Sequence, residues 1–499
     1  MLVVAGSSAF TGNFVHNGGQ ITFNTPSQYN RFGNSITFGN SIASTFVYAN
    51  PTSGAAVSAN YAFSDTGSNG FIITVGSVAS AGSMTFNGTW SGSISHSIGV
   101  GSATGASSLN SGFSDAFTYN ITGDNSALTS TLISNAFAIR NGIWGVGSST
   151  ALGTNNGLSV SIGETFDTRS GVVSGLWTNG YDVASAITTA LNTSTGTSMV
   201  TIGNSKTSGV ATFSGPINLT KSATATKVPA VKLVSNIGSR ANFSGIIADA
   251  GTGANVSTVS IGGGGTVALS GSNTYTGDAT VIGNTTMLAN SSAGSSTGTG
   301  NLTVSSGSTL GGTGFIAPGS GKTITAQSGG FIAPGDGGIG TVTLNGAGTA
   351  ATLLTMAGGS SFQFDLGTAN AMIGTIAVGS SDLLAFTGAA AGDLVFNSND
   401  VNFGGTGTEG YYKLFSTSLG SATTWIGLTF DGTSGVVSSG LTYSGLATGL
   451  TAGSFIVGTA SNGGTVGDIY FNAVPEPATW VLLAFSLTTV MILRRRQRA

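Results

Sequence analysis

Apolar side chains alternate with serine and threonine over short runs along much of the chain, and glycine, asparagine or serine bounds each run. Clear examples are residues 19–24 (GQITFN), 83–88 (SMTFNG), 301–306 (NLTVSS) and 340–346 (GTVTLNG). Because successive side chains of a β-strand point to opposite faces, this period of two predicts strands with one apolar and one hydroxylated face. The chain is therefore predicted to be all-β.

Helical periodicity is scarce along the chain. Its best window is residues 181–193 (YDVASAITTALNT), in which apolar residues fall near i, i+3, i+4 spacing. This window predicts one short helix or, as the alternative, another threonine-rich strand.

Short segments recur, as the hexapeptide GFIAPG does at residues 314–319 and 330–335. An identical hexapeptide in two nearby places indicates two similar turns stacked on each other, which is typical of a solenoid. We expect a right-handed parallel β-helix over roughly residues 200–360 and an all-β, solenoid-like fold over residues 1–200. A Greek-key sandwich, which also uses many short strands, is the alternative.

The composition favours stacked coils over an ordinary globular domain. Charged residues make up 6% of the 499 residues, against about 25% in an ordinary soluble domain. The hydrophobic content of 40% argues against disorder, and the 82 glycines suit the crowded corners where a solenoid chain turns. The absence of cysteine excludes disulfide bonds and thiolate metal sites. Lys and Arg total only 14, so a nucleic-acid partner is not expected.

Aromatic residues become more frequent from about Asp365 onward. This change predicts a β-rich cap that closes the end of the solenoid, since an open stack of strands would aggregate. The predicted organisation is a glycine-, serine- and threonine-rich solenoid-like region at 1–200, β-helix repeats at 201–364, the cap at 365–472 and a C-terminal segment at 473–499.

The C-terminal segment combines three features in a fixed order. Pro475, Glu476 and Pro477 come first, an uncharged apolar stretch follows at 478–493, and the last residues include Arg494, Arg495, Arg496 and Arg498. A helix over 478–493 would be about 24 Å long, slightly short of a ~30 Å hydrocarbon core, so we expect a single transmembrane helix there. Arginine excess marks the cytoplasmic side, so residues 1–474 are expected outside the inner membrane. The competing interpretation is a buried core helix with a solvated basic end.

This order of elements resembles the PEP-CTERM sorting signal. The resemblance implies that an exosortase, a membrane-embedded sorting enzyme, recognises Pro475, Glu476 and Pro477. It also implies that the apolar helix holds a precursor in the inner membrane transiently, with the arginines as the membrane stop. The mature protein would then reach the cell surface or the extracellular matrix.

The stretch GGGGTVALSGSNTYTGDATVIGNTTMLAN resembles the autotransporter-associated β-strand repeat, a module of autotransporter passenger domains. Gly271, Asn273, Tyr275 and Gly277 occupy matching places of the repeat motif. The departures are Asp278, where the family usually has a second glycine, and a polar NTT segment further on. The resemblance implies a β-helix and exposure at the cell surface, and it implies no chemistry.

The amino-terminal residues, MLVVAGSSAFTG, contain no cationic region and a very short apolar stretch. A secretory signal peptide requires a cationic start followed by roughly 7–15 apolar residues. Because the C-terminal segment implies export, we expect that the sequence starts downstream of the true amino terminus.

Residues able to carry chemistry are few. His16 and His96 lie far apart in the sequence and are expected to be solvated. Glu164 and Asp167, beside Arg169, could form the carboxylate pair of a glycoside hydrolase, but a salt-linked turn is the stronger interpretation.

Two glycine-rich segments also need an interpretation. Asp336, in APGDGGIG, resembles a calcium-binding turn of glycine-rich β-rolls, but the nonapeptide does not repeat, which favours a plain turn. The run Gly262–Gly265 precedes a predicted strand, which argues against a phosphate-binding loop. We therefore predict no catalytic residue, no metal site and no cofactor.

These observations predict an exported, non-enzymatic surface or matrix β-solenoid of a Gram-negative bacterium. Its long hydroxyl-rich surface, with serine and threonine open to glycosylation, would associate with exopolysaccharide or with like surface proteins, in a biofilm or in adhesion. One alternative is an autotransporter-type adhesin passenger, which would require a terminal membrane barrel. Another is a β-helix polysaccharide lyase, which would require clustered Asp, Lys and Arg.

Overall fold

The computed structural model describes residues 2–4, 13–17, 19–23, 35–38, 44–48, 56–60, 62–65, 71–75, 82–91, 96–100, 117–128, 137–139, 142–154, 157, 159–162, 173–191, 199–221, 230–250, 257–346, 352–367, 378–379, 381–387, 394–417, 425–431, 434–447, 450–459 and 464–475. Over these ranges the chain forms β-strands and no α-helix, which confirms the all-β prediction. The chain divides into two compact units, Met1–Thr309 with Gly314–Gly319, and Leu310–Thr313 with Ser320–Ala499.

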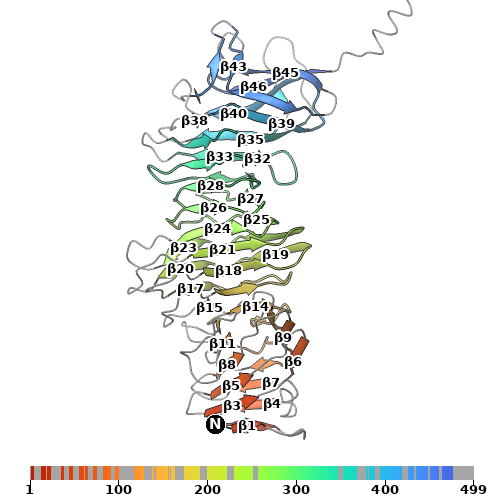
Figure 1. Ribbon diagram of the computed structural model, residues 1–499, viewed down its shortest axis with the longest axis vertical. Coiled ribbons are helices and arrows are strands. Elements are labelled where there is room, and N and C mark those ends of the chain that lie inside the picture. Colours follow the sequence, from red (N-terminus) through yellow and green to blue (C-terminus); the bar gives the residue numbers. More distant parts are fainter. Residues whose placement is uncertain are drawn as a thin grey trace, which may run out of the picture. The chain divides into compact units, whose positions relative to one another are not determined.

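Three parallel ladders and one small sheet build the first unit (Figure 1). Sheet 1 contains β1 (Leu2–Val4), β3 (Gly19–Phe23), β5 (Ser44–Tyr48), β8 (Phe71–Val75), β11 (His96–Val100), β13 (Phe137–Ile139), β15 (Val160–Ile162), β17 (Ile187–Leu191), β20 (Ile217–Lys221) and β23 (Ile247–Ala250). Sheet 2 contains β6 (Ala56–Ala59), β9 (Gly82–Phe86), β12 (Phe117–Ile121), β14 (Gly142–Val146), β16 (Val173–Trp177), β18 (Met199–Asn204), β21 (Ala230–Ser235), β24 (Thr258–Gly262), β26 (Ala279–Val281) and β28 (Leu302–Val304).

Sheet 3 contains β19 (Gly209–Phe213), β22 (Ser239–Phe243), β25 (Thr266–Leu269) and β27 (Thr286–Ala289). The small sheet contains β2 (Phe14–His16), β4 (Ser35–Phe38), β7 (Ala62–Asp65) and β10 (Trp90–Ser91). Two short strands complete the list for this unit: β30 (Phe315–Ile316) belongs to it, and β29 (Thr309–Gly312) crosses the boundary in the sequence.

Each ladder takes one strand from each successive pass of the chain. Strands β18, β19 and β20 lie in sheets 2, 3 and 1, and β21, β22 and β23 repeat that order. Neighbours are parallel and in register, so Gly209–Phe213 pairs residue by residue with Ser239–Phe243. This arrangement is consistent with a β-solenoid, and it excludes the Greek-key sandwich for this unit because the strands of such a sandwich are antiparallel.

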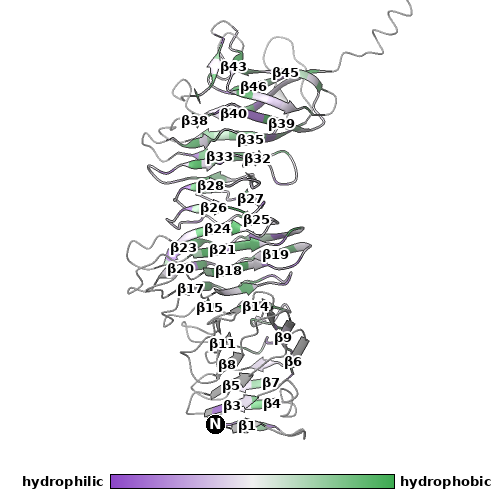
Figure 2. Ribbon diagram, in the orientation of Figure 1, coloured by the Kyte–Doolittle hydropathy of each residue, from purple (hydrophilic) through white to green (hydrophobic). Residues whose placement is uncertain are grey.

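The core consists of inward side chains that stack in rows along the ladders. In β22 the residues Ser239, Ala241 and Phe243 are buried, while Arg240 and Asn242 face outward. Register places Val267 and Leu269 of β25 beside Ala241 and Phe243. Figure 2 accordingly shows hydrophobic and hydrophilic residues mixed along the same strands. The alternation of apolar and polar positions therefore encodes a packed interior and a polar exterior.

Glycines stack on one another where neighbouring coils approach most closely. A Cβ atom at Gly245 would overlap the carbonyl oxygen of Gly215, and a Cβ atom at Gly271 would overlap the carbonyl oxygen of Gly245. Only glycine fits at such a position, because any other residue would force the coils apart. The high glycine content thus follows from the close stacking of turns.

The window at residues 181–193 contains no helix among its described positions. It forms an isolated bridge at Val183 and the strand β17 (Ile187–Leu191), so the alternative of a threonine-rich strand is correct. Buried residues recur at every second position, Val183, Ser185, Ile187 and Thr189. The neighbouring coils impose this period, and it overrides the weak helical spacing.

The second unit continues with parallel strands and ends in antiparallel ones. One ladder contains β31 (Ile324–Ala326), β34 (Leu354–Met356), β38 (Leu394–Val395) and β41 (Trp425–Ile426), and another contains β32 (Phe331–Pro334), β35 (Ser361–Leu366), β39 (Asn399–Gly405) and β44 (Leu441–Gly445). A third sheet contains β33 (Thr341–Asn345), β37 (Leu383–Thr387), β40 (Gly410–Thr417), β46 (Ile469–Pro475) and β45 (Leu450–Val457), with β36 (Val378–Gly379) beside β40. The strands β42 (Thr429–Phe430) and β43 (Val437–Ser439) form an antiparallel pair.

Strand β46 pairs antiparallel with both of its neighbours, β40 and β45. This pairing ends the parallel order over the residues that were predicted to form a cap. The four segments predicted from the sequence, with boundaries at 200, 364 and 472, stay a prediction. Over the described ranges the chain contains no helix that is long and apolar enough to cross a membrane. The expected transmembrane segment, residues 478–493, lies outside the described residues.

Candidate functional site

The described chain ends at the first residue of the predicted sorting motif. Pro475 is the last residue of β46, where it is the register partner of Leu450 on β45. Glu476 and Pro477 follow directly and lie outside the described residues, as do Arg494, Arg495, Arg496 and Arg498. Strand β46 is therefore the element that would present the motif.

Aromatic side chains hold β46 in its place between β40 and β45. The buried ring of Phe471 packs against Phe403, Phe455 and Tyr443, with ring centroids 4.2, 5.3 and 5.6 Å away. Gly453 lies on β45 two residues before Phe455, the register partner of Phe471; a Cβ atom at Gly453 would overlap the Phe471 ring, so glycine makes room for this ring. These contacts fix the strand that leads to the motif.

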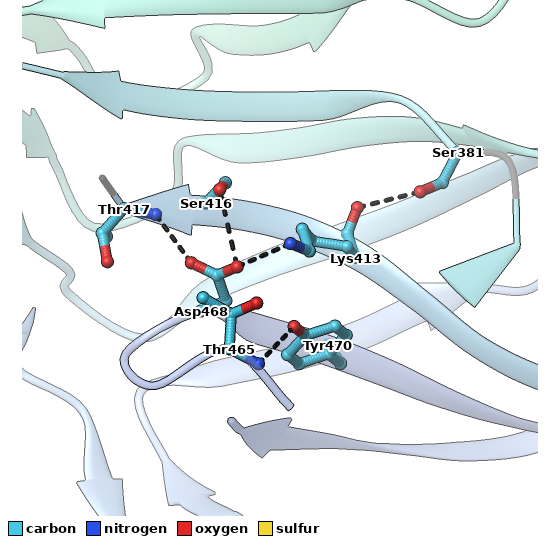
Figure 3. Close-up of polar contacts among 7 residues, drawn as sticks. All are labelled: Ser381, Lys413, Ser416, Thr417, Thr465, Asp468 and Tyr470. Carbon is cyan, nitrogen blue, oxygen red and sulfur yellow. Dashed lines mark hydrogen bonds and ion pairs between the residues drawn. The ribbon is translucent and has the colours of Figure 1, made fainter. Parts of the chain in front are cut away.

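A buried ion pair anchors the beginning of β46 (Figure 3). Asp468 is fully buried, and its Oδ2 atom lies 2.8 Å from Nζ of Lys413 on β40. The backbone N–H of Thr417 donates to Oδ1 of the same carboxylate over 2.8 Å. The carbonyl oxygen of Asp468 accepts from the N–H of Gly458 at 2.8 Å. One residue thus ties β46 to both flanking strands.

The Asp468 carboxylate stabilises the charged form of Lys413. Burial by itself lowers the pKa of Lys413, but its hydrogen bond to Asp468 and the charge of that carboxylate raise the pKa above its usual value overall. The Lys413 ammonium also lies 5.6 Å from the centre of the Tyr470 ring. The two ions contact each other, and the carboxylate also accepts from a backbone N–H, which suits an anchor for the strand.

The predicted repeat motif lies between stacked coils of the first unit. The side chain of Asn273 accepts from the N–H of Ile247 at 2.7 Å and donates to the carbonyl oxygen of Ser296 at 2.6 Å. Its own N–H donates to the carbonyl oxygen of Ser295 at 2.8 Å. The amide therefore joins the preceding coil to the following one.

The other motif residues serve the same packing. A Cβ atom at Gly277 would overlap the carbonyl oxygen of Ser257, as one at Gly271 would overlap Gly245. Tyr275 is fully buried, and its hydroxyl group has no hydrogen-bond partner among the described residues. Burial, with the nearby charge of Asp249, raises the pKa of Tyr275 far above its usual value. These residues build the stack and present no reactive group to solvent.

The departure from the repeat at Asp278 has a structural explanation. Its carboxylate accepts from the backbone N–H of Asn301 at 2.9 Å and from the side-chain amide of Asn301 at 3.1 Å. The aspartate thus ties one coil to the next at a position where glycine would provide no such contact.

Sequence reasoning did not single out a second asparagine with the same role. The side chain of Asn125, which is fully buried, accepts from the N–H of Trp90 at 2.7 Å and donates to the carbonyl oxygen of Ala151 at 2.8 Å. Both asparagines stand two residues after a tightly packed glycine, Gly123 or Gly271. The spacing glycine–any residue–asparagine was the signal that could have located this position.

A buried carboxylate in the second unit also escaped the sequence analysis. Asp382 is 3% exposed, and its oxygens accept from the N–H of Gly340 at 2.8 Å and the N–H of Asp365 at 2.7 Å. Burial raises the pKa of Asp382 to about 6. The hydrogen bonds from the two backbone N–H groups lower this pKa, but burial outweighs them, and the charge of Asp365 adds to the rise. This carboxylate therefore joins backbone segments of neighbouring strands through hydrogen bonds.

The remaining candidates are placed as follows. The expectation that His16 is solvated is wrong: its side chain is 9% exposed and stacks on Phe14, with ring centroids 6.3 Å apart. The side chain of His96 and the residues Glu164, Asp167 and Arg169 lie outside what the structure describes.

The two glycine-rich segments lie in loops that connect strands. Asp336 lies, half-buried, in the bend after β32; Gly262 is the last residue of β24, and the following glycines, 263–265, join it to β25. Over the described residues, no group of three or more His, Cys, Asp or Glu side chains could hold a metal ion. The sequence as a whole matches no protein-family model and has no significant similarity to a curated protein.

Proposed function

We propose that the chain is an exported, non-enzymatic β-solenoid of the bacterial cell surface or extracellular matrix, sorted through Pro475, Glu476 and Pro477 by an exosortase-type enzyme. The observation that carries this proposal is the fixed order of the motif, the apolar stretch and the arginines. The sorting enzyme and, transiently, the inner membrane are then its partners. We take the solenoid to be right-handed, because parallel crossover connections are right-handed in the great majority of proteins.

The anchored strand β46 supports this role for the motif. Proline lacks an N–H group, so Pro475 and Pro477 cannot extend a strand ladder in the normal way and favour an extended backbone. An extended motif that follows a firmly held strand would be suited to the groove of a processing enzyme. The buried ion pair of Asp468 would keep the folded body intact while the motif is bound.

The polar outer face of the solenoid supports a role in association with exopolysaccharide. Charged residues make up only 6% of this chain, and its hydroxyl groups outnumber them. Hydroxyl groups both donate and accept hydrogen bonds, as sugars do. An autotransporter-type adhesin is the second candidate, which the repeat motif around Asn273 favours. Both candidates place the solenoid outside the cell.

Localisation of the full chain in a bacterium with an exosortase-type system tests the sorting role. The Glu476→Gln variant should accumulate in the inner membrane fraction, with an uncleaved C-terminal segment detected by mass spectrometry. The matched control is Glu409→Gln, which changes an exposed glutamate on the folded body and should be delivered normally. Normal delivery and processing of Glu476→Gln would contradict the proposal.

A further inference from the structure

A shallow groove of about 420 Å³ opens on the outer face of sheet 3 in the first unit. It lies over the first residues of β19, β22, β25 and β27, where it is lined by Val210, Arg240, Thr266 and Thr286 and by the buried Ser239. Each of these strands is parallel to the next, so the groove runs across the coils.

The floor of the groove is open because the preceding turns carry glycine. Gly209, Gly238 and Gly264 have positive φ angles of 84°, 83° and 79°, the region that glycine adopts most easily. A Cβ atom at Gly209 would meet nothing within 4 Å, whereas one at Gly238 would overlap the carbonyl oxygen of Thr207. The turns therefore expose backbone where side chains would otherwise fill the hollow.

Register arranges four of the side chains that line the groove in one row. Val210 is the partner of Arg240, Arg240 of Thr266, and Thr266 of Thr286. Neighbouring members of such a row lie about 4.8 Å apart, the spacing between strands. An apolar side chain, a cation and two hydroxyl groups thus follow one another at regular intervals.

Arg240 gives the groove a positive charge. It is the one charged residue among those that line the groove, in a chain with 17 acidic and 14 basic residues. Its Nε–H donates to Oδ1 of Asn242 at 2.7 Å, which fixes the plane of the guanidinium group. A guanidinium group held in this way matches the two oxygens of a carboxylate.

We propose that this groove binds a segment of an acidic polysaccharide, with a uronate carboxylate on Arg240 and sugar hydroxyl groups on Thr266 and Thr286. Val210, which is 54% exposed, offers an apolar contact for the carbon-bound hydrogens of an adjacent sugar ring. This inference rests on the proposed function, because it names the class of glycan with which the exported solenoid associates. A polysaccharide fits better than a protein partner because the row is hydroxyl-rich and contains a single aliphatic side chain.

Titration calorimetry with the full chain tests the inference, with oligogalacturonate as the probe and its methyl ester as the uncharged control. The wild type should bind oligogalacturonate at least about tenfold more tightly than the ester, the factor expected for one charge-assisted hydrogen-bonded pair. Equal affinity for the two ligands, or no binding of either, would overturn the proposal. Polyglutamate tests an anionic polypeptide, and tighter binding of polyglutamate would overturn it as well.

Variants of the groove residues test whether oligogalacturonate binds to this row of side chains. Arg240→Gln should weaken oligogalacturonate binding about tenfold or more, Arg240→Lys less than that, and the pair Thr266→Val with Thr286→Val several-fold. Lys232→Gln removes a cation from β21, outside the groove, and should leave binding unchanged. Unchanged binding by Arg240→Gln would overturn the assignment.

Two further readouts separate this inference from the proposed function. Thermal unfolding should show that Arg240→Gln is folded. Arg240→Gln should also be delivered and processed normally, because it leaves the sorting motif intact. Normal delivery combined with the absence of glycan binding in the wild type would refute the inference alone, whereas failure of the Glu476→Gln test would refute the sorting role.

Discussion

The ring of Phe243 lies on the ring of Phe213, with centroids 4.7 Å apart and planes inclined by only 5°. The two residues are register partners on β22 and β19, and both are almost fully buried. Their separation equals the usual spacing of about 4.8 Å between neighbouring strands, so the backbone ladder sets the stacking of the core. Each coil must therefore offer a side chain of suitable shape at the same place.

Glycine enforces the same spacing two residues further along each coil. Gly245→Ala would place a methyl group against the carbonyl oxygen of Gly215. We expect a loss of about 1–3 kcal/mol in the free energy of unfolding, as for other overpacked sites, measured by urea denaturation. The control is Gly338→Ala, where a Cβ atom would meet nothing within 4 Å and the backbone is not left-handed. Equal stabilities of the two variants would contradict this role of Gly245.

Asn273 should be indispensable for the contact between its neighbouring coils. Asn273→Ala leaves the N–H of Ile247 and the carbonyl oxygen of Ser296 without their partner. Each of these two buried groups left unpaired costs about 1–3 kcal/mol, so we expect a total loss of about 2–6 kcal/mol. Hydrogen exchange should show faster exchange of the Ile247 amide in the variant. Exchange at the wild-type rate would contradict the bridging role.

The alternation of apolar and polar residues was sufficient to predict strands, because each coil buries one face and exposes the other. It could not fix the register, which depends on partners such as Arg240 and Thr266 in different coils. The helical spacing at residues 181–193 was misleading because the ladder imposes a period of two on the residues around Ile187. His16 also escaped correct interpretation, since its polar sequence surroundings did not indicate that it packs on Phe14.

The candidate sites were predictable only where the order of residues carries the information. The proposed sorting motif at Pro475 and the resemblance to a repeat around Asn273 rest on the order of residues alone and stay predictions. The hydrogen bonds of the Asp382 carboxylate depend on the N–H groups of Gly340 and Asp365, and the groove depends on the alignment of four strands. Such long-range pairings leave no local pattern.

Asp382 should make stability depend on pH. Its ordinary pKa is 3.8, and burial raises it to about 6 in the folded protein. Between those two values the folded chain keeps a proton that the unfolded chain has released. The free energy of unfolding should therefore fall as pH rises from about 4 to about 6, by on the order of 2 kcal/mol, and Asp382 contributes no further change above that range.

The contribution of Asp382 is isolated by comparing variants across this pH range. Asp382→Asn removes the titrating group, so its unfolding free energy should change less between pH 4 and pH 6 than that of the wild type. Asp365→Asn removes the neighbouring charge that raises the pKa of Asp382, and it should move the transition to lower pH. Parallel curves for the wild type and Asp382→Asn would contradict this explanation.

The ion pair of Asp468 and Lys413 should control the order of β46, the strand that precedes the proposed sorting motif. Asp468→Asn leaves the Lys413 ammonium without its carboxylate. Removal of one partner of a buried ion pair costs about 3–5 kcal/mol of stability. Because Lys413 is 24% exposed, we expect a smaller loss of about 2–3 kcal/mol in the free energy of unfolding. Lys413→Met together with Asp468→Asn removes both charges and should recover part of that loss. Hydrogen exchange of the Tyr470 and Phe471 amides reports on β46 directly. If exchange in Asp468→Asn stayed at the wild-type rate, the ion pair would not be the anchor of β46, and the aromatic cluster around Phe471 would hold the strand alone.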